Sequence, residues 1–227
     1  MSDQHGKRYR QDVEKVPGKP VTVAEAVNVL KQFAPCKFDQ TVELAIWLGI
    51  DPKQAEQAIR GTISLPHGIG KSKKVIAFCD GETAIAAKAA GAIEAGADEL
   101  IKKVQDGWTD FDVAVAPPAM MRSVSRLGRV LGPLGKMPSP KAGTVVEDIP
   151  TAVKEYAAGK IEFRNDDGGN LHVPVGKTSF DAEKLVDNIE TFLDRIRSLK
   201  PPTSKGTYIK KACVSATMTP AVLLDVQ

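Results

Sequence analysis

Two short segments of the chain carry the glycine-lysine-hydroxyl pattern that ends a nucleotide-binding P-loop. They are Gly70-Lys71-Ser72 and Gly176-Lys177-Thr178. In a P-loop, backbone amides and the lysine hold phosphates, and a glycine five positions earlier opens the loop. That position holds Leu65 in the first segment and Leu171 in the second, and both lie in strand-like runs. The pattern therefore favours chance matches, and a P-loop-like nucleotide-dependent enzyme is kept only as the alternative hypothesis.

The histidines and cysteines, which could serve in catalysis or metal binding, are isolated from one another in the sequence. They are His5, His67, His172, Cys36, Cys79 and Cys213. Neither a nucleophile signature nor a metal-ligand spacing surrounds any of them, so we expect structural histidines and free thiols. The sequence predicts no catalytic residue, no metal and no cofactor, and hence a protein that is not an enzyme. Free thiols are typical of a reducing compartment.

The densest run of glycine, proline and positive charge lies between Leu127 and Val146. This segment holds four glycines and three prolines, which disfavour both a packed helix and a central strand. No acidic residue occurs from Val113 to Val146, whereas five basic residues do: Arg122, Arg126, Arg129, Lys136 and Lys141. The segment predicts a shaped, positively charged loop with an anionic partner.

The overall composition is that of a globular protein long enough for two domains. The 227 residues are 42% hydrophobic and the formal net charge is +3. The first residues lack the apolar core of a signal peptide, and no run approaches the ~18 apolar residues of a membrane span. We therefore expect a cytoplasmic protein with no membrane partner.

The low aromatic content weighs against recognition of single strands by rows of stacked rings. Aromatic residues make up 5% of the chain, and we expect both Trp47 and Trp108 to pack in the core. Recognition of a folded RNA would need basic and hydroxyl side chains instead, of the kind found at Lys37, Thr41 and Thr217. Composition alone leaves open the alternative that such hydroxyl groups are only solvated.

The first third of the chain is typical of a mixed α and β domain. Thr22 and Glu25 have the spacing of a capping box, which predicts a helix that ends before Pro35. The alternation from Phe38 to Leu48 predicts a half-buried strand, interrupted at Gln40. A short helix is expected from 51 to 59, and a strand from 62 to 65.

A linker composition at 66–74 precedes a change in character. Apolar runs at 75–79 and 111–116 predict buried strands, and they alternate with helices expected at 82–95, 100–104 and 149–157. Such alternation is typical of a parallel sheet in an α/β domain.

After Gly159 the half-buried pattern of the first third returns. The runs 161–163 and 171–175 predict a hairpin, followed by a long helix that buries Leu185 to Ile196 and by a strand from 208 to 217. We infer an α+β domain formed by 1–67 plus 160–227 and interrupted by an inserted α/β domain, 68–159. The two crossings between the domains predict a hinge.

Three long segments resemble the bacterial large-subunit ribosomal protein L-one family, the protein of the mobile stalk. They read KFDQTVELAIWLGIDPKQAEQAIRGTISLPHGIGK from Lys37, LGRVLGPLGKMPSPKAGTV from Leu127, and GKIEFRNDDGGNLHVPVGKTSF from Gly159. They occur in the family's order and spacing, and the resemblance extends nearly from end to end. It implies a split α+β sandwich domain interrupted by a three-layer, Rossmann-like α/β domain.

The resemblance also implies a function. We expect a structural protein of the large ribosomal subunit that binds large-subunit rRNA at the mobile stalk, assists release of tRNA from the exit site and represses translation of its own operon mRNA. Such a protein would be cytoplasmic, ribosome-associated and, when free, monomeric.

Finally, the resemblance implies which residues contact RNA. The expected primary positions are Lys37, Phe38, Thr41, Thr217, Met218 and Thr219, with Arg164, His172 and Lys211 as neighbouring candidates. A secondary RNA or tRNA contact is expected at Arg129, Lys136 and Lys141. The family has glycine where this chain has Thr219, so a β-branched residue stands at a turn that could require positive φ.

Overall fold

The structure is a computed structural model that describes residues 6–54 and 56–226. The chain forms two compact units. One contains the residues up to Gly70 together with those from Phe163 onward, and the other is Lys71–Glu162. The first is called here the split unit and the second the inserted unit. The chain enters and leaves the inserted unit once each.

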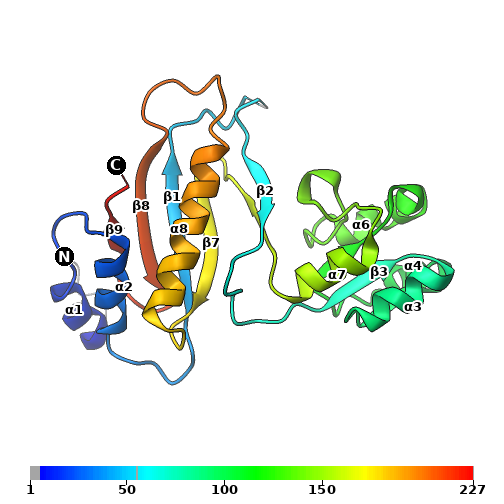
Figure 1. The fold of residues 1–227 in the computed structure, drawn as a ribbon, viewed down its shortest axis with the longest axis horizontal. Helices are drawn as coiled ribbons and strands as arrows, with labels where there is room; N and C mark the ends of the chain where they lie inside the picture. The colour runs from blue at the N-terminus through cyan, green and yellow to red at the C-terminus, as the bar shows by residue number, and fades with distance from the viewer. Residues whose placement is uncertain (1–5, 55, 227) are drawn as a thin grey trace. The chain divides into compact units, whose positions relative to one another are not determined.

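A four-stranded antiparallel sheet forms the centre of the split unit (Figure 1). β1 (Thr41–Leu48) lies between β7 (Asn170–Lys177) and β8 (Ile209–Ala216), and β9 (Val222–Leu224) pairs with the far side of β8. Every second residue of β1 is fully buried. The predicted alternation is therefore confirmed, although the strand begins at Thr41 rather than at Phe38.

Helices cover one face of this sheet. α2 (Val23–Lys31) and α8 (Ala182–Ser198) pack against each other and against the strands, as Figure 1 shows. The predicted capping box is present, because the Thr22 hydroxyl accepts from Glu25 N–H and the Glu25 carboxylate accepts from Thr22 N–H. A further helix, α1 (Lys7–Glu14), forms in the basic N-terminal segment. The opposite face of the sheet presents the alternate residues of β1, including the exposed Trp47.

The predicted hairpin is wrong in its pairing. β6 (Ile161–Arg164) pairs with β2 (Arg60–Ile63), whereas β7 belongs to the four-stranded sheet. Asn165 explains the difference, because its backbone N–H donates to Ile59 O (3.0 Å) and its side-chain oxygen accepts from Ile59 N–H (2.7 Å). The chain is thus held beside β2 up to the turn that starts β7.

The helix predicted at 51–59 is also wrong. The described residues of this stretch form turns. Asp51 Oδ1 accepts from Lys53 N–H at 3.1 Å, and Gln57 Oε1 accepts from Asp51 N–H at 2.9 Å. Side chains that bond to nearby backbone in this way compete with helical hydrogen bonds.

The inserted unit has a parallel three-stranded sheet with β3 (Val75–Phe78) between β4 (Glu94–Gly96) and β5 (Val113–Val115). Its two faces carry separate apolar clusters, one around Phe78 and the other around Tyr156. The helices of this unit are α3 (Gly81–Ala89), α4 (Asp98–Gln105), α5 (Met121–Val124), α6 (Gly128–Leu131) and α7 (Ile149–Ala157), with 3₁₀ turns η1 (Pro118–Met120), η2 (Ser125–Leu127) and η3 (Pro140–Ala142).

One helix of this unit is shorter than predicted. The helix expected at 82–95 ends as α3 at Ala89. Gly91 follows in a left-handed conformation (φ 109°) and Ile93 N–H donates to Val75 O (2.9 Å), which starts β4 beside β3. Alanine-rich composition concealed this strand, since alanine favours helices.

The Gly/Pro-rich segment is more ordered than a loop. It contains α6 and η3, and it buries Leu127, Leu131 and Ala142. The prediction that this segment is not helical is therefore wrong at its start. Gly143 ends η3 with φ 62°, a conformation that favours glycine.

The predicted fold class is confirmed. An antiparallel sheet with helices on one face forms the split unit, and a parallel sheet between two apolar layers forms the inserted unit. Among the described residues, no helix is both long and apolar enough to span a membrane.

Candidate RNA-binding site

The two ends of the split unit meet at the start of β1. Thr217 N–H donates to Thr41 O (3.1 Å), and Thr41 N–H donates to the Thr217 hydroxyl (3.2 Å). Lys177 Nζ donates to the Thr41 hydroxyl at 2.9 Å. All six predicted primary residues lie within four positions of this Thr41 and Thr217 pair, and they are called the strand-end surface: Lys37, Phe38, Thr41, Thr217, Met218 and Thr219.

Gln40 joins the segments beneath this surface. It is 4% exposed, and its Oε1 accepts from Met218 N–H at 2.9 Å. Its backbone carbonyl accepts from Thr178 N–H, also at 2.9 Å. Sequence reasoning missed this residue, although the interruption of the strand pattern at Gln40 was a signal. A polar side chain at an inward position is buried only with a partner.

The turn after β8 is closed by the side chain of Thr219. Its hydroxyl accepts from Ala216 N–H at 2.9 Å, and its backbone N–H donates to Ala216 O at 3.1 Å. Outside glycine, none of the described residues has positive φ. The threonine that replaces the expected glycine therefore fits this turn without backbone strain, and it adds a hydrogen bond that glycine could not make.

Two large apolar side chains project from this hydrogen-bonded frame into solvent. Phe38 is 53% exposed and Met218 is 50% exposed. Both residues lie within three positions of the Thr41 and Thr217 pair, and Lys37 beside them is exposed as well. Exposed apolar patches that are rimmed by polar residues mark interaction sites, so this pair of side chains is a candidate for one.

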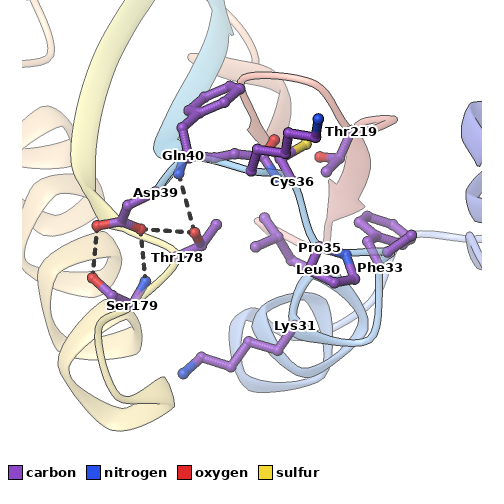
Figure 2. Close-up of a pocket in the computed structure, with 13 residues that line it drawn as sticks. Leu30, Lys31, Phe33, Pro35, Cys36, Asp39, Gln40, Thr178, Ser179 and Thr219 are labelled. Atoms are coloured by element: carbon purple, nitrogen blue, oxygen red, sulfur yellow. Dashed lines mark hydrogen bonds between the residues drawn. The ribbon is translucent and has the colours of Figure 1, made fainter.

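Asp39 joins the loop before β1 to the turn between β7 and α8 (Figure 2). Its carboxylate accepts from the Ser179 hydroxyl (2.8 Å), from Ser179 N–H (3.1 Å) and from the Thr178 hydroxyl (2.9 Å). The hydrogen bond from the Ser179 side chain is the main reason why the pKa of Asp39 lies below its usual value. The carboxylate therefore stays charged at neutral pH, and its bonds hold the loop in place.

A groove of about 590 Å³ lies beside the strand-end surface. As Figure 2 shows, Leu30 and Phe33 from the α2 side line it, with Cys36 and Thr219 on the side of the strand ends. Arg8 of α1 reaches this region, because its guanidinium donates to Cys36 Sγ and to Met218 O, the latter at 3.0 Å. One arginine thus contacts Met218 of the strand-end surface and Cys36, the residue before Lys37.

The three neighbouring candidates are not part of this cluster. On the sheet face, His172 lies opposite Ala45 and Lys211 lies opposite Trp47. Trp47 is six residues from Thr41, so Lys211 lies ~20 Å along the strand from the strand-end surface. Arg164 is exposed on β6, which belongs to the two-stranded sheet formed with β2.

The secondary candidates differ among themselves. Arg129 and Lys141 are exposed. Lys136 is half-buried, donates to Thr109 O at 2.9 Å and lies 5.3 Å from the centre of the Phe111 ring. Lys136 therefore has a structural role that the sequence did not indicate.

The P-loop-like segments are used for packing. A Cβ atom at Gly70 would lie 2.9 Å from Lys177 Cγ, so the first segment packs against the second. Gly70 has φ 71°, and Lys177 bonds to Thr41. A Cβ atom at Gly176 would lie 2.7 Å from Leu185 Cδ2, so close packing explains both glycines.

The isolated histidines and cysteines have ordinary surroundings. His67 Nε2 lies 3.0 Å from Asp187 Oδ2, whereas His5 lies outside the described residues. Cys36, Cys79 and Cys213 are free thiols. Within residues 6–54 and 56–226, no three metal-ligating side chains come together.

Comparison with known proteins gives the same family over most of the chain. Residues 30–220 match the ribosomal protein L1p/L10e family. Large ribosomal subunit protein uL1 of Kosmotoga olearia is 54% identical over 209 residues, covering 92% of this chain and 90% of that protein. The protein of the same name from Thermus thermophilus is 50% identical over 223 residues, 97% of each chain. That from Nitratidesulfovibrio vulgaris is 49% identical over 222 residues, 97% of this chain and 94% of its own.

Proposed function

Because this chain belongs to the ribosomal protein L1p/L10e family, we propose that it binds a folded segment of large-subunit rRNA at the mobile stalk through the strand-end surface. Membership of the family makes it a structural component of the large ribosomal subunit, associated with ribosomes in the cytoplasm, and not an enzyme. The proposal concerns what the protein binds and which residues bind it.

The observation that carries the proposal is the pair of exposed apolar side chains on a rigid polar frame. Phe38 and Met218 flank the Thr41 and Thr217 hydrogen bonds. In our proposal the two apolar groups pack against nucleotides, the threonine hydroxyl groups bond to riboses or base edges, and Lys37 holds a phosphate. Folded RNA is recognised mostly through phosphate and 2′-hydroxyl contacts, and its unstacked bases pack against side chains.

The finer parts of the proposal extend the same surface to other RNAs. We infer that the domain 1–67 plus 160–227 also binds a similar structure in the protein's own operon mRNA and so represses translation. The domain 68–159 would touch RNA or departing tRNA through Arg129, Lys136 and Lys141. Arg164, His172 and Lys211 are secondary candidates on the first domain, and the free protein is proposed to be a monomer.

Filter binding of the full chain to the stalk segment of large-subunit rRNA tests the proposal. Lys37→Ala and Thr217→Ala should each weaken binding by ~1–3 kcal/mol, the range of a lost specific contact. Thr217→Ser keeps the hydroxyl and should retain most of the affinity. Lys102→Ala, at an exposed lysine of α4 in the inserted unit, is the matched control.

Two further measurements make the result decisive. Thermal unfolding of each variant separates a lost contact from a damaged fold, and co-sedimentation with large subunits tests assembly into the ribosome. If Lys37→Ala and Thr217→Ala bind stalk RNA as tightly as the unmodified protein, the assignment of the surface is wrong. The same two substitutions should weaken binding of the operon mRNA in parallel.

A further inference from the structure

The open face of the four-stranded sheet has a shallow hollow away from the strand-end surface. Its volume is about 250 Å³, and its lining includes the small side chains of Ala45 and Cys213 and the ring of Trp47. Trp47 is 46% exposed, so the expectation that it packs in the core is wrong. Small residues beside an exposed indole leave room for a flat group to lie against the ring.

Positive charge is concentrated on the β8 side of this hollow. The β1–β8 register shifts between Trp47 and Leu48, and both Lys210 and Lys211 are exposed at this irregularity. Lys210 Nζ lies 4.6 Å from the centre of the Trp47 ring. A Cβ atom at Gly49 would lie 2.3 Å from Thr207 O, so the glycine allows the close approach of the chain that leads into β8 and Lys210. Strand irregularities that redirect side chains are frequent at functional sites.

The β7 side of the hollow supplies hydrogen-bonding groups. Asn170 lies opposite Trp47, and His172 lies opposite Ala45. The carboxylate of Asp166 accepts from Asn170 Nδ2 at 3.0 Å and lies 3.9 Å from His172 Nε2. Asp166 is therefore on the β7 side and the lysines are on the β8 side, while the exposed Glu43 lies on the same face of β1, two positions from Ala45.

These groups together fit a nucleotide. Pockets that enclose whole small molecules measure ~300–1,000 Å³, so a hollow of about 250 Å³ suits one ring of a larger ligand. An exposed indole offers a stacking surface, and adjacent ammonium groups offer phosphate contacts. A peptide would gain little from two lysines at the rim unless it were acidic.

We propose that this hollow binds one unpaired nucleotide of the RNA, with the base stacked on Trp47 and its phosphates held by Lys210 and Lys211. His172 bonds to the edge of the base. This inference rests on the proposed RNA binding and adds a contact ~20 Å from the strand-end surface along β1. An exposed contact between an ammonium group and an aromatic ring is weaker than a stacked base, so Lys210 can leave the ring for a phosphate.

Fluorescence of Trp47 tests the stacking directly. The chain has two tryptophans, so Trp108→Phe leaves Trp47 as the single reporter in the full chain. Titration with the stalk segment of large-subunit rRNA should quench its emission, and so should a single-stranded adenosine hexanucleotide at higher concentration. A fully paired RNA duplex should leave the emission unchanged.

The affinity of variants for stalk RNA provides a second test of the proposal. Trp47→Ala should weaken binding of the stalk RNA by roughly 5- to 150-fold, the range of one stacked base. Trp47→Phe should weaken it less, and Lys211→Ala should reduce the salt slope by about 1. Equal thermal midpoints for these exposed-site variants show that the fold is intact.

The outcomes distinguish this inference from the proposed function. If Trp47→Ala binds normally while Thr217→Ala binds weakly, the nucleotide site is wrong and the strand-end surface stands. If the unmodified protein does not bind stalk RNA, both fail. Quenching by paired duplex RNA would overturn the unpaired nucleotide. An emission change with assembled large subunits but not with RNA would assign the hollow to a ribosomal protein and also overturn the proposal.

Discussion

The Leu127–Val146 segment and the strand-end surface use charge and apolar groups in opposite ways. The segment is rich in glycine, proline and basic residues, yet it buries Leu127, Leu131 and Ala142 within the inserted unit. The strand-end surface has modest charge, yet it exposes Phe38 and Met218. The more basic region thus turns most of its large apolar side chains inward, and Leu134, 50% exposed, is the exception.

The two regions also differ in what their hydrogen-bonding groups do. In the basic segment, the Thr144 hydroxyl accepts from Ser139 N–H at 2.8 Å and Lys136 donates to Thr109 O. The polar groups of this segment therefore form hydrogen bonds within the inserted unit. At the strand ends, polar groups bind one another beneath apolar groups that remain exposed. In the proposed function, charge density therefore does not locate the binding surface, because the apolar groups that we propose contact RNA lie in the less basic region.

The largest effect is expected where the apolar groups are exposed. Phe38→Ala combined with Met218→Ala should weaken binding of stalk rRNA by ~2 kcal/mol or more, since a single aromatic-base contact contributes ~1–3 kcal/mol. Stability should change little because both side chains are about half exposed. Isothermal titration and thermal unfolding measure the two quantities. Unchanged affinity would break the contrast between the two regions.

A smaller effect is expected from restoring glycine at the turn. Thr219→Gly removes the hydroxyl that accepts from Ala216 N–H, and it increases the conformational freedom of the backbone in the turn after β8. We expect the free energy of unfolding to fall by ~1 kcal/mol, with a parallel loss of RNA affinity because the turn must then be ordered on binding. Chemical denaturation and filter binding test this. A glycine variant that is equally stable and binds more tightly would mean that the threonine side chain obstructs RNA.

The smallest effect is expected at the basic segment. Arg129→Ala with Lys141→Ala should reduce the salt slope of RNA binding by about 1 for each lost phosphate contact. The affinity should fall by less than ~1 kcal/mol, as expected for exposed charges. Lys102→Ala, an exposed lysine of α4, is the control. A loss larger than that of the Phe38 and Met218 variant would reverse the comparison.

Sequence patterns predicted the fold where local chemistry decides it. The capping box at Thr22 and the alternation in β1 are both present. The helix expected at 51–59 failed because Asp51 and Gln57 bond to the backbone. The hairpin failed because strand pairing is non-local, and a tight turn does not determine which strand lies beside which.

The candidate site depended on contacts that no local pattern contains. Gln40 and Met218 are 178 positions apart, and Arg8 reaches Met218 across 210 positions. The resemblance to a family predicted that the strand-end residues belong to one site, and the structure places them close together. The resemblance did not indicate Arg8 or Gln40, and the expectation that Trp47 packs in the core led away from its exposed ring. The RNA contacts themselves stay predictions.

The central position of β1 has a consequence for the synthesis of the chain. Both of its neighbours, β7 and β8, follow the inserted unit in the sequence. Thr41 must wait 176 residues for Thr217, which takes roughly 10–35 s at typical elongation rates of ~5–20 residues per second. The inserted unit can fold during that interval. The strand-end surface cannot form until the last strands emerge, so an incomplete chain lacks the surface that we propose binds RNA.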